Sequence, residues 1–223
     1  MFSVTEGWKT QYPGAAAGVL AMGNVANPKN HAAMDRAKEE LEAQIRASFG
    51  SKEELRALDR LQAYRAYYKR FKKTYHVQLQ LESIAFKGKS IPRGAALVEA
   101  MFVAELKNML LTAGHDLDVV EPPVKLDVAQ GSERYTRING QEQQLKAGDM
   151  YISDTQGVLS AVIYGPDQRT RILPTTRRVL FTVYAPPGIG AEAVQQHLQD
   201  MEAYVRLFAP QAETELLQVY EAD

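Results

Sequence analysis

The sequence contains no cysteine, which excludes disulfides, thiolate metal sites and catalytic thiols. Its apolar runs fall far short of the ~20 residues that cross a membrane, so we expect no membrane contact. It begins without a basic region followed by an apolar run, a pattern that predicts no signal peptide and favours a cytoplasmic protein. Nucleophile-elbow serines, Walker phosphate loops and zinc-protease histidine pairs are also missing. An enzyme built from this chain would therefore work without a side-chain nucleophile.

The overall composition is that of an ordinary globular protein. Apolar residues make up 45% of the 223 residues and charged residues 24%, which is enough to fill a sizeable core. Without internal repeats or low-complexity linkers, the simplest prediction is one α+β domain, with a mixed or antiparallel β core flanked by helices. Its predicted parts are a mainly helical lead-in with a basic segment (1–112), a β-rich pocket region (113–185) and C-terminal helices (186–223).

Apolar residues at 3–4 spacing predict helices on both sides of the pocket region. A capping box at Ser51-Lys52-Glu53-Glu54 opens a helix that continues to Tyr68. Pro92 opens a long helix that runs through Leu110, with Gly114 as its C-cap. The other predicted helices are His31 to Ala47, Val77 to Phe86, Ala191 to Phe208 and Thr214 to Tyr220.

From Val119 onward the apolar period shortens towards two, which predicts strands. Turns at Asn139-Gly140 and Gly165-Pro166 separate them. The predicted strands are Val124–Val128, Tyr135–Ile138, Met150–Ser153, Val158–Ile163 and Val179–Tyr184, with two earlier ones before Trp8 and at Ala17–Val25.

The segment from Ser51 to Arg93 is strongly basic, with eleven basic residues against four acidic ones. Tyrosines such as Tyr64 and Tyr68 are interleaved with the cations, a mixture that suits a phosphate backbone and stacked, unpaired bases. The helical period explains the same tyrosines as core residues beneath a solvated face, and both interpretations stay open. The candidate RNA-binding residues are Arg65, Lys69, Arg70, Lys72, Lys73, Lys87 and Lys89.

Two further motifs favour simple structural interpretations. Gly188-Ile189-Gly190 lies between a strand and a helix, as a dinucleotide loop does. The preceding prolines and the lack of a following βαβ unit favour a plain connection instead. His115 with Asp116 and Asp118 offers too few ligands for a metal site, so we expect neither metal nor cofactor.

Polar residues between Ala113 and Thr176 lie at the ends of short apolar runs, mostly beside glycine or proline. Strand ends joined by tight turns bring such residues to one rim of a domain. The order is Gly114-His115-Asp116-Leu117-Asp118, Gly131-Ser132-Glu133, a strand ending at Asp154, Asp167-Gln168-Arg169-Thr170 and Thr176 to Phe181.

These motifs, in this order and spacing, resemble the B3/B4 editing domain of the phenylalanyl-tRNA synthetase beta chain. They resemble more closely the free-standing proteins made of that domain alone. Upstream, Tyr64-Arg65, Lys69, Glu82 and Ile91-Pro92 extend the resemblance over nearly the whole chain.

The resemblance implies hydrolysis of a wrong amino acid from a charged tRNA, in a pocket beside the strands. An aminoacyl ester is already activated, so a positioned water and an oxyanion-stabilising environment suffice. The implied partners are the acceptor end of a tRNA and a small amino-acid moiety in the pocket. The implied catalytic residues are His115, Asp116 and Thr170, and the implied substrate-binding residues are Glu133, Asp154, Asp167, Arg169 and Thr176.

Three positions depart from the pattern of the family. Ala113 stands where the synthetase domain has a histidine, and Thr182 stands where it has a glutamate that helps to recognise tyrosine. Phe102 occupies a position that is commonly asparagine in the free-standing relatives. His115 remains either a proton shuttle or a structural residue.

Three functions stay open on these grounds. They are a trans-editing deacylase, a non-catalytic RNA- or tRNA-binding module, and a small-molecule enzyme that takes a free amino acid or its ester. The sequence itself specifies neither the amino acid nor an oligomeric state.

Overall fold

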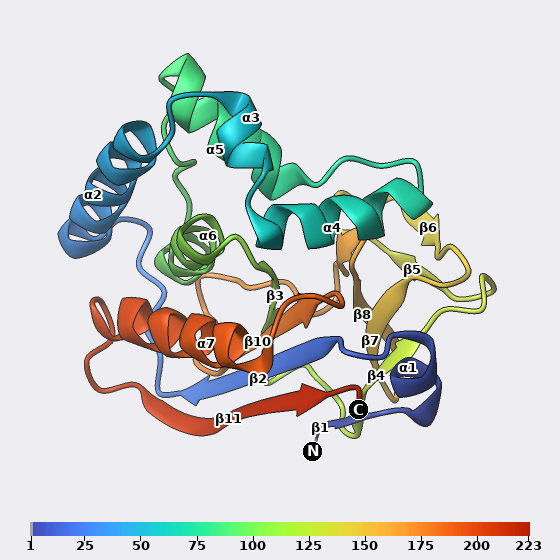
Figure 1. Cartoon of the computed structure of the whole chain (residues 1–223). Helices are drawn as coiled ribbons and strands as arrows, with labels where there is room; N and C mark the ends of the chain where they lie inside the picture. Colours follow the sequence, from blue (N-terminus) through green and yellow to red (C-terminus); the bar gives the residue numbers. More distant parts are fainter. Residues whose placement is uncertain (1) are drawn as a thin grey trace.

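The computed structural model describes residues 2–223, which form an α+β fold (Figure 1). The helices of this part of the chain are α1 (Glu6–Gln11), α2 (Ala32–Ser48), α3 (Lys52–Arg56), α4 (Asp59–Arg70), α5 (His76–Lys87), α6 (Ala96–Asn108) and α7 (Ala191–Arg206). The strands are β1 (Phe2–Val4), β2 (Ala16–Gly23), β3 (Leu111–Asp116), β4 (Val124–Val128), β5 (Arg134–Thr136), β6 (Glu142–Gln144), β7 (Met150–Asp154), β8 (Gly157–Ala161), β9 (Gly165–Pro166), β10 (Val179–Ala185) and β11 (Glu213–Glu221).

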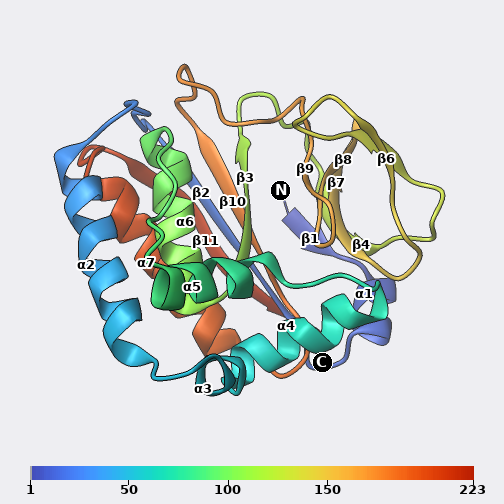
Figure 2. The same ribbon diagram turned by 90° about the horizontal axis from the view of Figure 1, so that it is seen from above.

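The first sheet has the strand order β11-β2-β10-β3 and is antiparallel throughout. Every residue of β2 and β10 is buried, because the helices cover one face and the second sheet lies on the other. Figure 2 shows α2, α6 and α7 to one side of this sheet and β4, β7 and β8 to its other side. Helix α7 approaches β2 so closely that a Cβ atom on Gly18 would lie 2.6 Å from Val194 Cγ1. Glycine is therefore required where the helix crosses the strand.

The second sheet has the order β1-β4-β7-β8-β9 and is mixed, since β1 pairs with β4 in parallel and the other pairs are antiparallel. Most of β4 and β7 alternates buried and more exposed positions, as in a sheet with one face on the core. One cluster of buried apolar side chains extends through both sheets and the helices, from Phe2 to Ala222. A smaller cluster around Tyr135 and Leu145 supports the β5–β6 hairpin.

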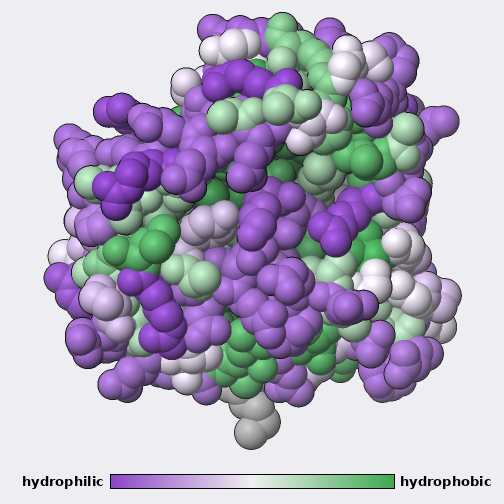
Figure 3. All heavy atoms as spheres, turned by 60° about the vertical axis from the view of Figure 1, so that its left-hand side comes forward, coloured by the Kyte–Doolittle hydropathy of each residue, from purple (hydrophilic) through white to green (hydrophobic). Residues whose placement is uncertain are grey.

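The helical lead-in follows the predicted pattern in part: the cap forms at Ser51, but the long helix begins at Ala96 and not at Pro92. The Ser51 hydroxyl accepts from the Glu54 N–H at 3.1 Å, and the Glu54 carboxylate reaches back to the Gly50 N–H at 2.8 Å. The helix that this cap opens is interrupted at Ala57 and resumes as α4. Within residues 2–223 no helix is long and apolar enough to span a membrane. On the face in Figure 3, hydrophobic side chains are scattered among hydrophilic ones.

The prediction of a C-terminal helix at Thr214 to Tyr220 is wrong. Residues Glu213–Glu221 form β11, which pairs with β2 along its free edge. The edge of β2, whose residues are all buried, needs hydrogen-bond partners for its backbone, and this requirement outweighs the ambiguous apolar spacing of a nine-residue segment.

The predicted end of the long helix is also wrong. Helix α6 ends at Asn108, where Met109 adopts the left-handed conformation with φ of 60°. Gly114 lies inside the strand β3, all of whose residues are buried. A Cβ atom there would lie 2.8 Å from Ile172 Cδ1, so this glycine serves close packing and not a helix end.

Candidate functional site

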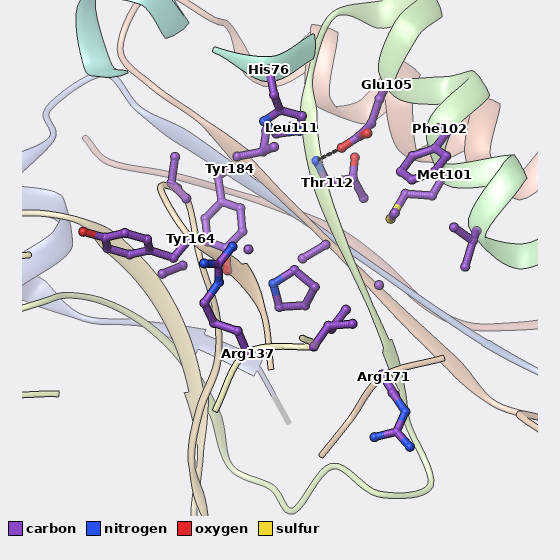
Figure 4. A pocket seen from close by; sticks show the side chains of 18 of the residues that line it. His76, Met101, Phe102, Glu105, Leu111, Thr112, Arg137, Tyr164, Arg171 and Tyr184 are labelled. Atoms are coloured by element: carbon purple, nitrogen blue, oxygen red, sulfur yellow. Dashed lines mark hydrogen bonds between the residues drawn. The ribbon is translucent and has the colours of Figure 1, made fainter. Parts of the chain in front are cut away.

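The main cavity of about 470 Å³ lies between α6, the strands β3 and β10, and the segment 161–172 (Figure 4). Its wall is largely apolar. The lining residues are His76, Val98, Met101, Phe102, Glu105, Leu111, Thr112, Ala113, Gly114, Arg137, Ile138, Ala161, Val162, Ile163, Tyr164, Gly165, Pro166, Arg171, Ile172 and Tyr184.

The secondary structure sets the order of these side chains. Met101 and Phe102 lie four and three residues before Glu105 on α6, so both share a face of the helix with it. The strand register places Thr182 of β10 opposite Ala113 of β3, which lines the cavity. In Figure 4 Arg171 lies at the opposite end of the cavity from Glu105, and Arg137 lies at one side.

Glu105 is the buried charge-bearing group of this wall, with 2% of its surface exposed. Its Oε1 atom accepts from the Thr112 N–H at 2.7 Å. Burial in these surroundings raises the pKa of the Glu105 carboxyl to about 8. A group with such a pKa inside a cavity is a candidate functional residue on physical grounds.

The two arginines at the mouth have few partners. The Arg171 Nη1 atom donates to the Gln168 carbonyl at 2.9 Å, and the structure of residues 2–223 gives the Arg137 side chain no hydrogen bond or ion pair. Lys73 also approaches the cavity, since its Nζ atom lies 5.9 Å from the ring centre of Tyr164. The mouth is therefore cationic, whereas the interior carries the Glu105 carboxyl.

His115, predicted to be catalytic, lies outside the cavity wall and is fully buried. Its Nδ1 atom lies 2.8 Å from Thr170 Oγ1 and its Nε2 atom 3.2 Å from Ser160 Oγ. The Thr170 hydroxyl donates to Asp167, so it accepts from His115, and Nε2 is left as the acceptor of the Ser160 proton. Burial first, and Arg169 second, lower the pKa of His115 to about 3. The imidazole is therefore neutral at physiological pH.

This hydrogen-bonded chain reaches the cavity through Tyr184. The Tyr184 hydroxyl lies 2.5 Å from Ser160 Oγ, and Tyr184 lines the cavity. Through Ser160, His115 is thus two hydrogen bonds behind the wall residue Tyr184, and Thr170 is three.

The side chain of Arg169 is held by other residues of the protein and is not free to bind a ligand. Its Nη2 atom contacts both oxygens of Asp154 at 2.8 and 2.9 Å, and its Nη1 atom donates to the Val119 carbonyl at 3.0 Å. Its Nε atom lies 3.7 Å from Asp167 Oδ2. Asp167 and Arg169 line a second, more open hollow next to the cavity, and both hollows include Arg171.

The remaining predicted residues support loops. The Thr176 hydroxyl donates to Asp116 Oδ2 at 2.6 Å and accepts from the Leu173 N–H at 2.9 Å. Glu133 accepts from the N–H groups of Gln130 and Gly131, both at 3.0 Å, and so stabilises its own turn.

The structure therefore brings most of the predicted site residues together, but not around the main cavity. The exception is Glu133, which lies in the 130–133 turn. The residues that the sequence did not single out are Glu105, Arg137, Tyr164, Arg171 and Tyr184. A lone acid within the apolar run Val103-Ala104-Glu105-Leu106 was the available signal for Glu105.

The basic segment presents its cations to solvent but not its aromatic rings. All seven candidate RNA-binding residues are exposed. Of the two open interpretations the structure favours the core one, because the rings of Tyr64, Tyr67, Tyr68, Phe71 and Tyr75 are all buried. Tyr64 and Tyr75 stack on each other at 4.2 Å within that core.

The cations also divide into two groups. Arg70 and Lys72 border one hollow with Lys146, at the end of α4. Lys87 and Lys89 lie at the far end of α5, where the Lys89 carbonyl accepts from Arg46 of α2 at 3.1 Å. Figure 1 shows these ends of α4 and α5 on opposite sides of the molecule.

The Gly188-Ile189-Gly190 loop and the acidic residues next to His115 have structural roles. Gly190 is the N-cap of α7, and β10 before it pairs only with antiparallel neighbours, so the glycine loop is a simple connection. Within residues 2–223 no group of three or more histidine or acidic side chains is arranged to hold a metal ion. Asp116 instead accepts from the Asp118 N–H at 3.2 Å, as a turn residue does.

The comparisons with known proteins agree with this architecture. A search of solved structures finds the crystal structure of an N-terminal fragment of the phenylalanyl-tRNA synthetase beta-subunit from Pyrococcus horikoshii, with a TM-score of 0.50 and 13% sequence identity. The match covers 98% of this chain and half of the synthetase fragment, and it shows a shared fold. A search of curated proteins gives no match. The family model of the B3/4 domain matches residues 61–207. The chain therefore belongs to the B3/4 domain family.

Proposed function

We propose that this protein hydrolyses the ester of a misacylated tRNA, with the amino-acid moiety in the main cavity and the acceptor end at its mouth. The observation that carries this proposal is the cavity. Its volume of about 470 Å³ and its largely apolar wall with a few polar groups are typical of small-molecule sites. The cations at its mouth suit a phosphate, and the apolar interior suits an amino-acid side chain.

Hydrolysis of an aminoacyl ester needs no nucleophilic side chain. An aminoacyl ester is activated, so holding it beside a water in the right geometry supplies much of the rate. A terminal ribose hydroxyl of the tRNA can assist that water. In this proposal His115 and Thr170 are positioning residues, because they fix Ser160 and through it Tyr184. Asp116 holds Thr176 and with it the loop after Ile172, a residue of the cavity wall.

The RNA would enter from the side of Lys73, Arg137 and Arg171. These cations surround the mouth, and Arg171 continues into the second hollow, where the predicted phosphate ligand Arg169 lies. The related synthetase fragment comes from an enzyme whose name states that it acts on tRNA, and this supports an RNA partner for the present chain.

One observation favours a second function, a tRNA-binding module without hydrolysis. Ala113 and Phe102 both line the cavity, and these are the positions at which the resemblance leads us to expect histidine and asparagine. The wall therefore lacks two polar groups that the relatives possess. Such a module would bind RNA with steep salt dependence and without turnover.

The experiment is to incubate the purified protein with a panel of misacylated tRNAs and to follow ester loss against an enzyme-free blank. Met101→Trp narrows the cavity and should abolish the loss, whereas Leu207→Trp, at an exposed position beyond α7, should not. Ester loss confined to a few pairs and sensitive to Met101→Trp supports the deacylase. Salt-sensitive tRNA binding without ester loss supports the binding module, and hydrolysis of free amino-acid esters alone points to a small-molecule enzyme.

A further inference from the structure

Glu105 has fewer hydrogen-bond donors around it than Glu99 and Asp149, two other deeply buried carboxylates. Glu99, on the same helix, pairs with Lys38 at 2.6 Å and also accepts from the Gly94 N–H. Asp149 accepts from the Tyr67 hydroxyl at 2.6 Å and from the Ile163 N–H at 3.2 Å. Within residues 2–223, Glu105 accepts only from the Thr112 N–H and pairs with no cation. A buried carboxyl with one donor costs stability, because burial without partners disfavours charge.

The missing partner has a place to bind. Glu105 lines the cavity between Thr112 and the apolar residues Met101 and Phe102, as Figure 4 shows. The nearby basic residue of α6, Lys107, is directed to Asp200 at 3.0 Å and not to Glu105. Within residues 2–223 no lysine, arginine or histidine, including His76 and Arg137 of the same cavity, pairs with the Glu105 carboxyl, so a ligand can supply the cation.

The charges along the cavity indicate the order of the charged and apolar groups in that ligand. Glu105 lies buried at one end, the exposed Arg171 lies at the opposite end, and the half-buried Arg137 lies at one side. A molecule with an ammonium group at one end, an apolar side chain beside it and a phosphate at the other end matches this order. An aminoacyl ester of a nucleotide has these three features, with the ammonium next to the ester.

We propose that Glu105 binds the free α-ammonium group of the amino-acid moiety, so that the site accepts aminoacyl esters and rejects N-acylated ones. This rests on the proposed function for the identity of the ester, but not for the binding of the ammonium group. An N-acyl group removes the positive charge and adds bulk where the wall closes around Glu105. The protein then acts on charged tRNA and spares peptidyl or formylated tRNA.

Ammonium binding should release a proton. In the free protein the Glu105 carboxyl, whose pKa burial raises to about 8, is mostly protonated at neutral pH. The bound ammonium stabilises the carboxylate form, so a proton leaves the Glu105 carboxyl when the ligand binds at pH 7. The neighbouring phenols of Tyr64, Tyr68 and Tyr75 stay neutral, because burial raises the pKa of each. The other titratable or charged groups facing the cavity are His76, Arg137, Tyr164, Arg171 and Tyr184.

The test uses ligands that cannot be hydrolysed. Leucinol, methioninol and phenylalaninol carry an ammonium and an apolar side chain, and their N-acetyl derivatives lack the charge. Calorimetric titration in two buffers of different ionisation enthalpy gives both the affinity and the number of protons released. Glu105→Gln keeps an oxygen for the Thr112 N–H and removes the charge. Glu99→Gln is the matched control, because it changes an equally buried acid on α6 that faces Lys38.

We expect at least one amino alcohol to bind the unmodified protein with proton release. Glu105→Gln should weaken this binding by about 10-fold or more and abolish the release, since the hydrogen bond between two charged groups is lost. Glu99→Gln should leave both unchanged.

Equal binding of the N-acetyl derivatives, unchanged binding by Glu105→Gln, or no binding of any amino alcohol would overturn the proposal. Binding with proton release in a protein that hydrolyses no aminoacyl-tRNA would refute the deacylase while leaving the role of Glu105 intact.

Discussion

The Nδ1 atom of His115 lies 2.8 Å from Oγ1 of Thr170. Because Thr170 gives its own proton to Asp167, this contact fixes the neutral imidazole with its proton on Nδ1. Both nitrogens are occupied and no part of the ring is exposed. The residue that looked like a proton shuttle in the sequence is held as a buried hydrogen-bonding group.

Burial of His115 makes its contribution to stability depend on pH. The pKa is about 3 in the folded protein and about 6.5 in the unfolded chain, so the unfolded state takes up a proton first as pH falls. The contribution is complete above about pH 6.5 and is lost towards pH 3. The raised pKa values of Glu105 and Asp149 act in the opposite direction in part of this range, so the stability of the unmodified protein alone is not diagnostic.

The difference in the free energy of unfolding between the unmodified protein and His115→Gln, called the stability gap below, reports on the histidine alone. The contributions of Glu105 and Asp149 are the same in both proteins and cancel. This gap should shift in favour of the variant by about 1.4 kcal/mol for each pH unit below about 6.5. Urea denaturation at pH 7, 6 and 5 measures the gap. A gap that stays constant over these three values would show that His115 is not held neutral by burial.

Arg169 should matter for stability more than for binding. Arg169→Ala removes the Nη2 group that contacts both oxygens of the buried Asp154 carboxylate, which keeps its backbone N–H donors, and we expect a loss of about 2 kcal/mol in the free energy of unfolding. Combining it with Asp154→Asn in a double-mutant cycle gives the coupling directly.

The matched control is Arg171→Ala, an exposed neighbour whose side chain, within residues 2–223, donates only to the Gln168 carbonyl. It should change stability by less than about 0.5 kcal/mol and weaken tRNA binding. If Arg169→Ala unfolds at the same urea concentration as the unmodified protein, the ion pair does not stabilise the fold.

Much of the fold follows from periodicity, and the exceptions have physical causes. The 3–4 spacing correctly predicts α2, α5 and α7, because one face of each is apolar, whereas it predicts α3 and α4 as a single helix. The apolar spacing predicts a helix where β11 lies, because nine residues with paired apolar positions satisfy both periods. Pairing with the edge of β2 decides between them, and that contact is invisible in the local sequence.

The candidate site was predictable in part. The turns around Asp154, Asp167 and Thr176 do converge, as strand ends joined by tight turns should. The sequence does not reveal that these polar groups satisfy one another in the interior. Glu105 was hidden in an apolar helix, because periodicity assigns an acid in that position to no particular role.

Replacing Thr182 with valine should make the folded protein more stable. Its Oγ1 atom is buried and has no hydrogen-bond partner within residues 2–223. Thr182→Val removes an unsatisfied polar atom at nearly constant shape, so we expect a gain of about 1 kcal/mol. Thr112→Val is the contrasting variant, because the Thr112 hydroxyl lies 2.7 Å from His197 Nε2, and it should lose stability instead. Thermal denaturation of both distinguishes them, and a destabilised Thr182→Val would mean that the hydroxyl has a partner.

The two groups of cations in the basic segment should differ in their effect on tRNA binding. Lys73 approaches Tyr164 at the cavity mouth and Lys72 lies next to it, whereas Lys87 and Lys89 lie at the far end of α5. Reversing the charge of Lys72 and Lys73 should lower the affinity and flatten the dependence of log Kd on log salt by about 1–2 units, since each phosphate contact contributes ~0.7–0.9. The double reversal Lys87→Glu and Lys89→Glu has the same change in net charge and should leave the slope nearly unchanged. Binding measured by fluorescence anisotropy at several salt concentrations gives both slopes. Equal flattening by the two pairs would place the RNA along α5, away from the mouth of the cavity.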